Sequence, residues 1–219
     1  MKPRVVVFDV MGTLFDLRPA RVRLEEIGAP GAALEAWFGR LLHSATSLTL
    51  SGAFRPFREI AETTLRTTLA QLDADETRAA YVLAALGELD AYPEADVAFA
   101  RLEEAGVRTA TLTNGGEEHT RGLLERAGLA DRVEAVITVD EVEAYKPAAA
   151  PYRHAAARLA AEPRELTLIA AHAWDVIGAR AAGLGAVWVD RLERRWPFPL
   201  PEPSRASNLV EAVEQALAR

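Results

Sequence analysis

The stretch VVVFDVMGTLFD, residues 5–16, decides the fold, because it joins an apolar run to a short polar turn. The run lacks the alternation of polar and apolar residues that a half-exposed strand shows. Four similar runs follow it: RTATLTN (108–114), AVITVD (135–140), LTLIAAH (166–172) and AVWVD (186–190). Runs of this kind are typical of strands covered on both faces, so the sequence predicts a central parallel sheet of about five or six strands.

Segments with helical periodicity separate the later runs. These are ADVAFARLEEAG (95–106), EEHTRGLLERAG (117–128), AAPYRHAAARLA (149–160) and DVIGARAAG (175–183). Three of them end at a glycine, which is favoured just after the last helical turn. Repetition of strand, helix and strand implies parallel strands joined by right-handed crossovers. The fold class is therefore α/β, with a Rossmann-like sheet.

The interval before residue 92 breaks this alternation, because its content is helical throughout. In the stretch 30–48, the apolar residues that share one helix face are Leu34, Trp37, Phe38, Leu41, Leu42, Ala45 and Leu48. Further helices are expected over 57–72 and 76–89. We therefore predict an all-helical cap over residues 16–91, inserted into an α/β core made of residues 1–15 and 92–219.

The C-terminal part of the chain adds one more helix to the predicted core. The proline-rich stretch 194–204 is expected to form no regular element. The sequence SNLVEAVEQALAR that ends the chain has helical character, and Ser207 is placed as its N-cap.

Composition excludes several classes of function. The net charge is −7 and the pI is near 5.2, which argues against a nucleic-acid partner. No apolar run approaches the roughly 18 to 20 residues of a membrane-spanning helix. The first strand begins almost at residue 1, which leaves no room for a signal peptide, so the cytoplasm is expected. The chain has no cysteine, which excludes disulfides, a thiolate nucleophile and a cysteine-bound metal.

Polar residues lie where the predicted strands end, and ligands of open parallel sheets bind beyond those ends. The residues are Asp9, Thr113, Asn114, Lys146, His172 and Asp175. Each has an ordinary alternative: Asp9 or Asp175 can cap a helix, Lys146 can be a solvated cation, and the Asn114-Gly115-Gly116 triplet can be only a turn. Their conjunction at one sheet edge favours a functional site.

Four segments together resemble the haloacid dehalogenase-like superfamily over nearly the whole chain. They are FDVMGTLFD, TLTNG, EAYKPAAAPY and HAWDVIGARAAG, and they are most similar to the 2-haloacid dehalogenase branch. The resemblance implies that Asp9 is a nucleophile and that Thr13, Lys146 and Asp175 are further catalytic residues. It also implies a set of residues that hold the substrate or line its pocket: Met11, Gly12, Thr113, Asn114, Tyr152, His172, Trp174, Leu42 and Phe57. For Leu42 and Phe57 plain core packing is an alternative, and the resemblance makes a homodimer plausible.

Met11 separates the possible reactions. Phosphatases of the superfamily carry a second aspartate at this position, because an alkoxide leaving group must be protonated as it departs. Methionine cannot donate that proton, whereas a halide leaves as a weak base without one. The residue therefore favours cleavage of a carbon–halogen bond in a small carboxylate substrate.

The last of these four segments, HAWDVIGARAAG, and the residue before it argue against an obligatory metal or other cofactor. Magnesium-dependent members carry an acid where this chain has Ala171, so only Asp9 and Asp175 remain as carboxylates. Mg²⁺ prefers an octahedral shell of oxygen ligands. The positive charge is expected to come from Lys146, one of two lysines in a chain with 25 basic residues.

The expected mechanism has two steps. Asp9 displaces the halide with inversion and forms an ester, and water activated by Asp175 then attacks the Asp9 carbonyl carbon. Backbone N–H groups of Met11 and Gly12 are expected to hold the oxyanion.

Three positions depart from the pattern of the branch, which carries Tyr, Arg and Asn where this chain has Met11, Phe38 and His172. The arginine is thought to receive the halide and orient the substrate. Arg40 does not replace it, since two residues turn a helix by roughly 200°. Arg55 and Arg58 are the candidates that remain.

Two other functions stay open from the sequence alone. One is a magnesium-dependent phosphatase acting on a small substrate. The other is a protein that keeps the fold and binds a ligand without turnover; it would be indicated if Asp9→Asn changed nothing.

Overall fold

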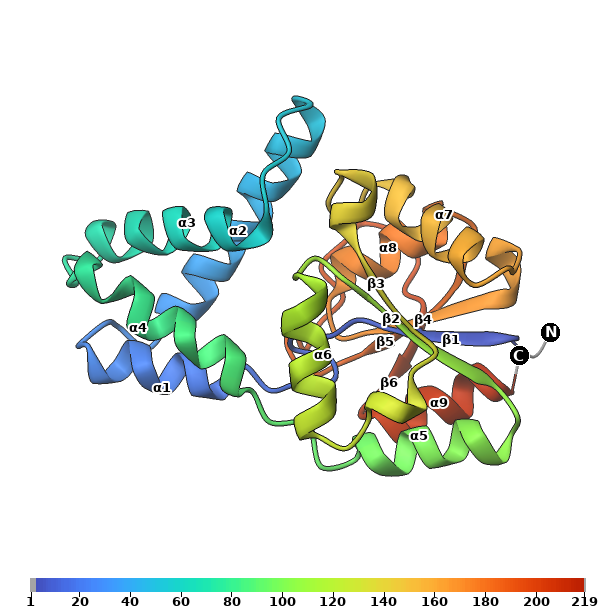
Figure 1. Cartoon of the computed structure of the whole chain (residues 1–219). Helices are drawn as coiled ribbons and strands as arrows, with labels where there is room; N and C mark the ends of the chain where they lie inside the picture. Colours follow the sequence, from blue (N-terminus) through green and yellow to red (C-terminus); the bar gives the residue numbers. More distant parts are fainter. Residues whose placement is uncertain (1–2, 219) are drawn as a thin grey trace.

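The computed structural model describes residues 3–218, and its centre is a six-stranded sheet in the order β3-β2-β1-β4-β5-β6 (Figure 1). The strands are β1 Val5–Phe8, β2 Arg108–Thr113, β3 Ala135–Thr138, β4 Leu166–Ala170, β5 Gly185–Val189 and β6 Ser204–Ala206. All neighbouring strands are parallel. The predicted α/β fold is confirmed. Strand β6 is not among the five runs that the sequence indicated as strands. It was missed because it begins at the end of the stretch 194–204, which was expected to be irregular.

Helices cover both faces of the sheet, which is why its strands lack alternation. They are α5 Ala95–Glu104, α6 Glu117–Arg126, α7 Ala149–Arg158, α8 Ala173–Ala181 and α9 Leu209–Leu217. Helices α5, α6 and α9 pack with Val6 and Phe8 on one face, whereas α7 and α8 pack with Val5 and Val7 on the other. Successive side chains of β1 are thus buried on opposite faces.

Helix ends follow local chemistry, with one correction. The glycines predicted to end helices, Gly106, Gly128 and Gly183, all have positive φ. The N-cap of α9 is Asn208 and not Ser207, since the Asn208 Oδ1 accepts a hydrogen bond from the Glu211 N–H at 2.9 Å. Ser207 lies one residue earlier, where its N–H and hydroxyl both donate to the Glu211 carboxylate.

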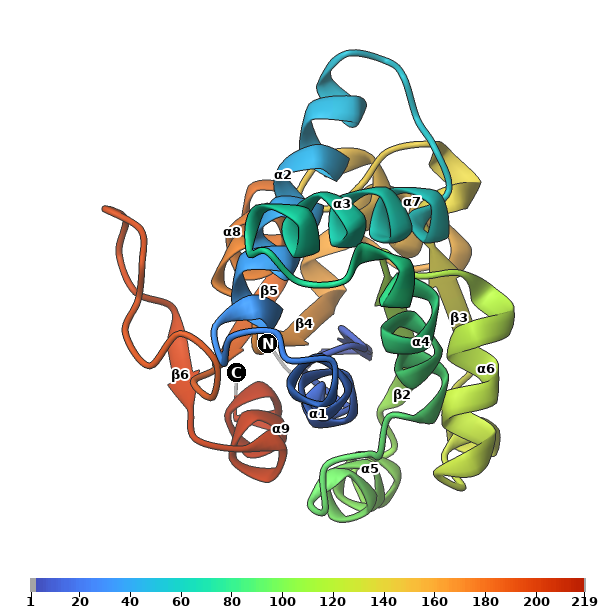
Figure 2. The same ribbon diagram turned by 90° about the vertical axis from the view of Figure 1, so that its left-hand side faces the viewer.

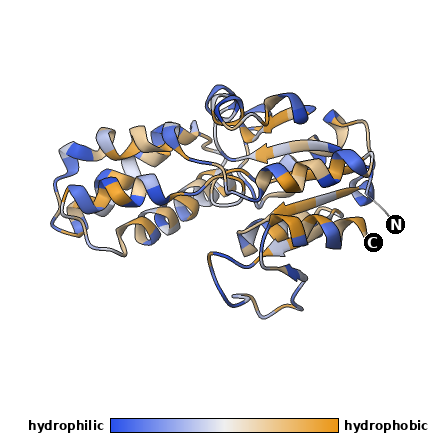
Figure 3. Cartoon of the chain, turned by 90° about the horizontal axis from the view of Figure 1, so that it is seen from below, coloured by the Kyte–Doolittle hydropathy of each residue, from blue (hydrophilic) through white to orange (hydrophobic). Residues whose placement is uncertain are grey.

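Residues 18–88 form a separate group of helices beside the core (Figures 1 and 2). They are α1 Arg18–Glu26, α2 Ala33–Leu50, α3 Phe57–Gln71 and α4 Ala79–Ala84, with short 3₁₀ helices η1 Glu76–Arg78 and η2 Ala85–Glu88 on either side of α4. We call α1 to α4 the cap helices. Figure 3 shows hydrophilic and hydrophobic residues interleaved along them, as expected for amphipathic helices. The single helix expected over 76–89 is wrong, because 3₁₀ turns replace its two ends.

The chain enters and leaves the cap helices through paired segments. Phe15 and Ala91 form an antiparallel bridge. The Asp16 N–H donates to the Asp90 carbonyl, and the Tyr92 N–H donates to the Leu14 carbonyl, each at 2.9 Å. This pairing supports a division between cap and core near residues 15 and 92.

Helix α6 contacts the segment through which the chain returns from the cap helices to the core. The Arg126 guanidinium donates to the carbonyl oxygens of Gly87 and Leu89.

Within residues 3–218, no helix combines the length and the apolar character that crossing a bilayer requires.

Candidate active site

Asp9 follows β1 directly and lies at the centre of a buried polar cluster. Its Oδ1 accepts a hydrogen bond from the Lys146 Nζ at 2.9 Å, and its Oδ2 accepts one from the Thr13 hydroxyl at 2.7 Å. The Thr13 oxygen in turn accepts from the Ala171 N–H at 2.9 Å, at the end of β4. Adjacent strands β1 and β4 thus hold both the carboxylate and its hydroxyl donor.

Lys146 is fully enclosed, with about 1% of its surface exposed. Besides Asp9, its Nζ donates to the Asp175 Oδ2 at 2.6 Å and to the Leu112 carbonyl at 2.8 Å, so each of its three protons has an acceptor. Its own N–H donates to the Asn114 Oδ1 at 3.0 Å, which fixes the loop to the end of β2. The structure therefore brings these residues together, and the alternative of a solvated lysine is wrong.

Asp175 lies opposite Asp9 across the lysine and has no exposed surface. Its Oδ1 accepts a hydrogen bond from the Tyr152 hydroxyl at 2.5 Å. Burial, together with the neighbouring carboxylate, raises the pKa of Tyr152 well above its ordinary value, so the phenol stays protonated as a donor. Tyr152 thus reaches the site through Asp175 and not through Asp9.

The two carboxylates differ in acidity because their surroundings differ. Burial alone would raise the pKa of Asp9, but the Lys146 charge and the hydrogen bond with His172 outweigh it and hold this pKa well below its ordinary value. Burial raises the pKa of Asp175, and the Asp9 charge adds to this effect against the opposing Lys146 charge. Although burial alone would lower the pKa of Lys146, the two carboxylates raise it. Asp9 is thus the carboxylate that loses its proton more readily, and Asp175 is the stronger base of the two.

The donor set of this site does not fit Mg²⁺. The Lys146 ammonium already lies between Asp9 and Asp175, within 2.9 Å of one carboxylate and 2.6 Å of the other. A divalent cation between them would face that ammonium at close range. Ala171 offers no third carboxylate. Lys146 therefore takes the place that a metal ion would need.

Gly178 of α8 keeps Tyr152 and the Lys146 loop in position by having no side chain. An added Cβ would lie 2.5 Å from the Tyr152 hydroxyl oxygen, 2.7 Å from the Pro147 Cβ and 2.9 Å from the Pro147 carbonyl oxygen. These distances are shorter than any allowed contact, so the loop or the helix would have to move.

Gly178→Ala should therefore lower both turnover and stability, the latter by roughly 1 to 3 kcal/mol. Urea denaturation and activity assays check this. The matched control is Gly122→Ala in α6, where an added Cβ meets nothing within 4 Å. That variant should gain up to about 1 kcal/mol, since alanine favours helix over glycine. Equal behaviour of the two variants would contradict this explanation.

The turn after Asp9 corrects one predicted contact. The Gly12 N–H donates to the Phe15 carbonyl at 2.7 Å, so it closes the turn instead of facing the reacting carbonyl. The Met11 N–H remains as the candidate oxyanion donor. Thr113 shapes the neighbouring turn, where its hydroxyl oxygen accepts from the Gly115 N–H at 2.9 Å, and has no hydrogen bond to Asp9 among the described residues.

His172 places a second nitrogen atom beside the Asp9 carboxylate, in addition to the Lys146 Nζ. Its Nδ1 lies 3.0 Å from the Asp9 Oδ2. Its ring stacks on Phe38 of α2, with centroids 5.3 Å apart and planes 19° apart, and it lies 5.2 Å from the Trp174 ring. Trp174 also covers Lys146, whose Nζ is 5.7 Å from that ring's centroid. The first turn of α8 therefore forms an aromatic wall beside Asp9.

A cavity of about 550 Å³ opens between the cap helices and the core at this wall. Its lining residues are Asp16, Leu17, Arg18, Arg21, Leu34, Glu35, Phe38, Gly39, Leu42, Tyr92, His172, Trp174, Leu192 and Glu193. Of the residues predicted to hold the substrate, Leu42, His172 and Trp174 line this cavity. The predicted placing of Phe57 is wrong, since Phe57 packs against the apolar core at the start of α3 and does not line this cavity.

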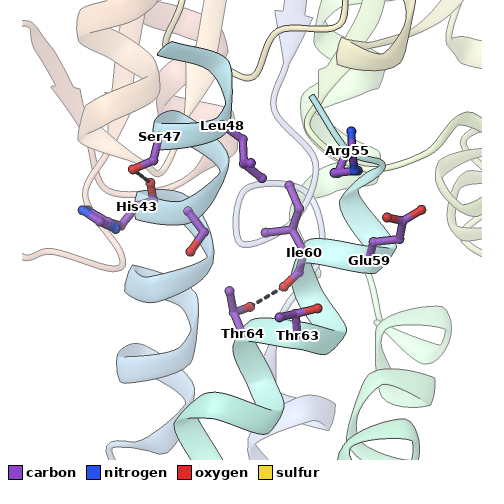
Figure 4. A pocket seen from close by; sticks show the side chains of 9 residues that line it. His43, Ser47, Leu48, Arg55, Glu59, Ile60, Thr63 and Thr64 are labelled. Carbon is purple, nitrogen blue, oxygen red and sulfur yellow. Dashed lines mark hydrogen bonds between the residues drawn. The ribbon is translucent and has the colours of Figure 1, made fainter. Parts of the chain in front are cut away.

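The arginines proposed to replace the lost cap arginine lie elsewhere. Arg55 lines a second groove of about 430 Å³ between α2 and α3, which Figure 4 shows from close by. Arg58 is exposed and does not line the cavity. Arg40 turns toward α3, where it donates to Thr68 and Gln71, as the helix geometry predicted.

Sequence reasoning missed the residues that follow β5. Leu192 and Glu193 line the cavity, and the Glu193 carboxylate accepts hydrogen bonds from the Ala173 N–H at 3.0 Å and from the Trp188 indole at 3.2 Å. The signal was available, because β5 ends at the same sheet edge as β1 and β4.

Comparison with known proteins identifies the family. The family model described as haloacid dehalogenase-like hydrolase matches residues 3–183. The chain is 32% identical to (S)-2-haloacid dehalogenase 1 of Pseudomonas sp. (strain CBS-3), over 98% of this chain and 96% of that protein. It is 29% identical to haloacetate dehalogenase H-2 of Moraxella sp. (strain B), over 99% and 96%.

Its fold also matches the solved structure of L-2-haloacid dehalogenase from Xanthobacter autotrophicus with chloropropionic acid covalently bound. The TM-score is 0.86 at 26% identity, and the match covers 97% of each chain. The buried Asp9, Lys146 and Asp175 cluster at the strand ends agrees with these relationships. The chain belongs to the haloacid dehalogenase-like hydrolases, in the 2-haloacid dehalogenase branch.

Proposed function

We propose that the protein hydrolyses the carbon–halogen bond of small (S)-2-haloalkanoic acids, giving a halide ion and a 2-hydroxy acid. One observation carries this proposal: the buried Asp9 carboxylate accepts a hydrogen bond from the Lys146 Nζ at 2.9 Å, and the position that would need an acid to protonate a basic leaving group holds Met11, which has no proton to donate. Support comes from the relatives, which act on (S)-2-haloacids and haloacetate, and from the related structure with covalently bound chloropropionic acid.

In the first step, an oxygen of Asp9 attacks the carbon that carries the halogen. The new carbon–oxygen bond forms as the carbon–halogen bond breaks, and the halide leaves with the bonding electrons. Thr13, Lys146 and His172 fix the carboxylate through hydrogen bonds, so little reorganisation is needed at the moment of attack. Attack opposite the leaving group inverts the carbon.

In the second step, water attacks the carbonyl carbon of the Asp9 ester. Asp175 takes the proton, because its raised pKa makes it the stronger base of the two carboxylates. Lys146 contacts both Asp9 and Asp175, so its charge stabilises the oxyanion. Collapse of the intermediate breaks the bond between the Asp9 carbonyl carbon and the product oxygen, and this oxygen takes the proton that Asp175 holds. The 2-hydroxy acid leaves, Asp9 keeps one oxygen from water, and the second proton of that water passes to solvent as Asp9 ionises again.

The test compares two reactions in the presence of EDTA or Mg²⁺. Halide release from 2-chloropropionate and 2-bromopropionate enantiomers should occur at the same rate in both media, with preference for the (S) enantiomer. Phosphate release from p-nitrophenyl phosphate should be absent in both, since neither an acid at residue 11 nor a magnesium site is present.

Phosphate release that requires Mg²⁺, without any halide release, would replace this proposal by the phosphatase alternative. Absence of both reactions would leave the binding protein as the better explanation.

A further inference from the structure

Tyr145 is a large buried side chain that no step of the proposed reaction uses. It directly precedes Lys146, and only about 1% of its surface is exposed. Its hydroxyl, its ring and its N–H all contact the last turn of α2 and the segment after it, residues 49–56, which we call the cap tip. Figures 1 and 2 show the cap tip next to the chain between β3 and α7, which carries Tyr145 and Lys146.

The three contacts use three different parts of Tyr145. Its hydroxyl donates to the Arg55 carbonyl at 2.7 Å. Its ring stacks on Phe54, with centroids 5.1 Å apart and planes 26° apart. Its N–H donates to the Thr49 Oγ1 at 3.0 Å. Because main chain and side chain are both held, the cap tip cannot shift without breaking contacts at the residue before Lys146.

The chemistry of the two hydroxyl groups agrees with these directions of donation. The Thr49 hydroxyl gives its own proton to the Ala45 carbonyl at 3.0 Å, so its oxygen is left to accept from the Tyr145 N–H. Burial raises the pKa of the Tyr145 phenol above its ordinary value, and the charges of Asp140 and Glu59 add to this effect. The phenol therefore stays protonated and remains a donor.

The core holds the same stretch of main chain from the other side. The Lys146 N–H donates to the Asn114 Oδ1, and the Tyr145 carbonyl accepts from the Ala148 N–H, each at 3.0 Å. Two successive N–H groups, those of Tyr145 and Lys146, thus have partners in the cap and in the core respectively. A displacement of the cap tip would therefore move the main chain from which the Lys146 side chain reaches its acceptors.

A second junction between cap and core lies at a different part of the chain. The Arg126 guanidinium of α6 donates to the Gly87 and Leu89 carbonyls, which belong to the segment that returns from the cap helices. This junction joins cap to core as the cap tip does, but it involves neither Tyr145 nor the residues that follow it. It therefore offers a comparison for the role of the cap tip.

We propose that Tyr145 is a positioning residue that couples the seating of the cap tip to the placement of the Lys146 ammonium between the two carboxylates. With the cap tip seated, the Tyr145 hydroxyl and N–H are paired, and the ammonium meets its three acceptors. With the cap tip displaced, the main chain before Lys146 loses these partners. The effect on turnover rests on the proposed function, whereas the effect on Lys146 itself does not.

The first test measures how fast the Lys146 amine of the folded protein reacts with acetic anhydride, by mass spectrometry of its peptide. The reaction should be slow in the unaltered protein, because the ammonium is buried and paired. Tyr145→Phe keeps the ring but removes the hydroxyl, and Thr49→Val removes the acceptor of the Tyr145 N–H. Each variant should raise the rate roughly five- to tenfold, as expected for one lost hydrogen bond.

Two control variants separate this coupling from general loosening. Arg126→Gln weakens the other junction between cap and core. Tyr81→Phe removes a tyrosine hydroxyl that donates to Glu26 within the cap helices. Both should leave the Lys146 rate unchanged. An equal rise in Arg126→Gln, or no rise in either cap-tip variant, would overturn the coupling.

The second test compares steady-state halide release from 2-chloropropionate. In Tyr145→Phe and Thr49→Val, kcat should fall by roughly five- to tenfold while KM changes much less, because Lys146 acts on the reacting carboxylates and does not line the substrate cavity. A purely structural role would leave the turnover of each folded molecule unchanged. Unchanged kcat in both variants would therefore count against the positioning role.

Failure of the coupling can be told from failure of the proposed function. Faster labelling of Lys146 in the cap-tip variants, in a protein that releases no halide, removes only the proposed reaction. Halide release by the unaltered protein, with Lys146 labelling that ignores Tyr145 and Thr49, removes only the coupling.

Discussion

Asp9→Asn should abolish halide release, lowering kcat by on the order of 10⁴- to 10⁶-fold, as the loss of a covalent nucleophile does elsewhere. An amide oxygen cannot form the ester, so the first step is lost and not merely slowed. The fold should survive, because asparagine has the same shape, and Lys146 and Thr13 can still hydrogen-bond to it. The assay is halide release together with thermal denaturation. Asp131→Asn is the control, since that aspartate is exposed in a 3₁₀ turn.

Isotope labelling tests the same step in the unaltered protein. A single turnover in ¹⁸O-labelled water should place the label in Asp9, which mass spectrometry of the active-site peptide detects, and leave the first product unlabelled. Label found directly in the first product, with none in Asp9, would show that water attacks the substrate carbon and would exclude the ester.

Lys146→Met should remove activity and much of the stability. The change leaves the Asp9 and Asp175 carboxylates buried without their shared cation, at a cost of about 3 to 5 kcal/mol. Loss of the Lys146 charge also removes the main force that keeps the pKa of Asp9 low, so the carboxylate becomes a poorer anion. Chemical denaturation gives the loss of stability, and halide release gives the loss of turnover.

Double variants separate the two effects. Lys146→Met combined with Asp175→Asn removes one of the stranded charges, so it should recover part of the stability but none of the activity. Lys146→Arg should remain inactive, because a planar guanidinium cannot present three donors to Asp9, Asp175 and the Leu112 carbonyl from one point. Full stability and activity in Lys146→Met would contradict the role given to this residue.

The strands and the sheet edge could be predicted because their signals are local. Runs such as VVVF are apolar at every residue, and this requires cover on both faces wherever the run lies. The parallel arrangement then places Asp9, Asn114, Lys146 and Asp175 at one edge. The quoted motifs assigned the branch from the same residues.

Other features depended on choices between local options of similar energy. Ser207 and Asn208 are both good N-cap residues, and only the backbone path decides that Asn208 caps α9. The 3₁₀ turns around α4 likewise reflect packing against α1 and α3, which periodicity does not report. Phe57 begins the expected helix, but it packs against the apolar core and does not line the cavity.

The sequence by itself determined the α/β fold, the family and the identity of the central charges, because burial periodicity and strand-end position are properties of short segments. Only the tertiary structure decided which atoms meet. It placed the Lys146 Nζ against the carboxylates of Asp9 and Asp175 and against the Leu112 carbonyl. It directed the Gly12 N–H to the Phe15 carbonyl. It also placed the His172 ring in contact with Phe38, Trp174 and Asp9. The reason is physical: hydrogen bonds and ring contacts form within about 3 to 6 Å between groups far apart in the chain, and a sequence pattern specifies faces and edges but no such distances.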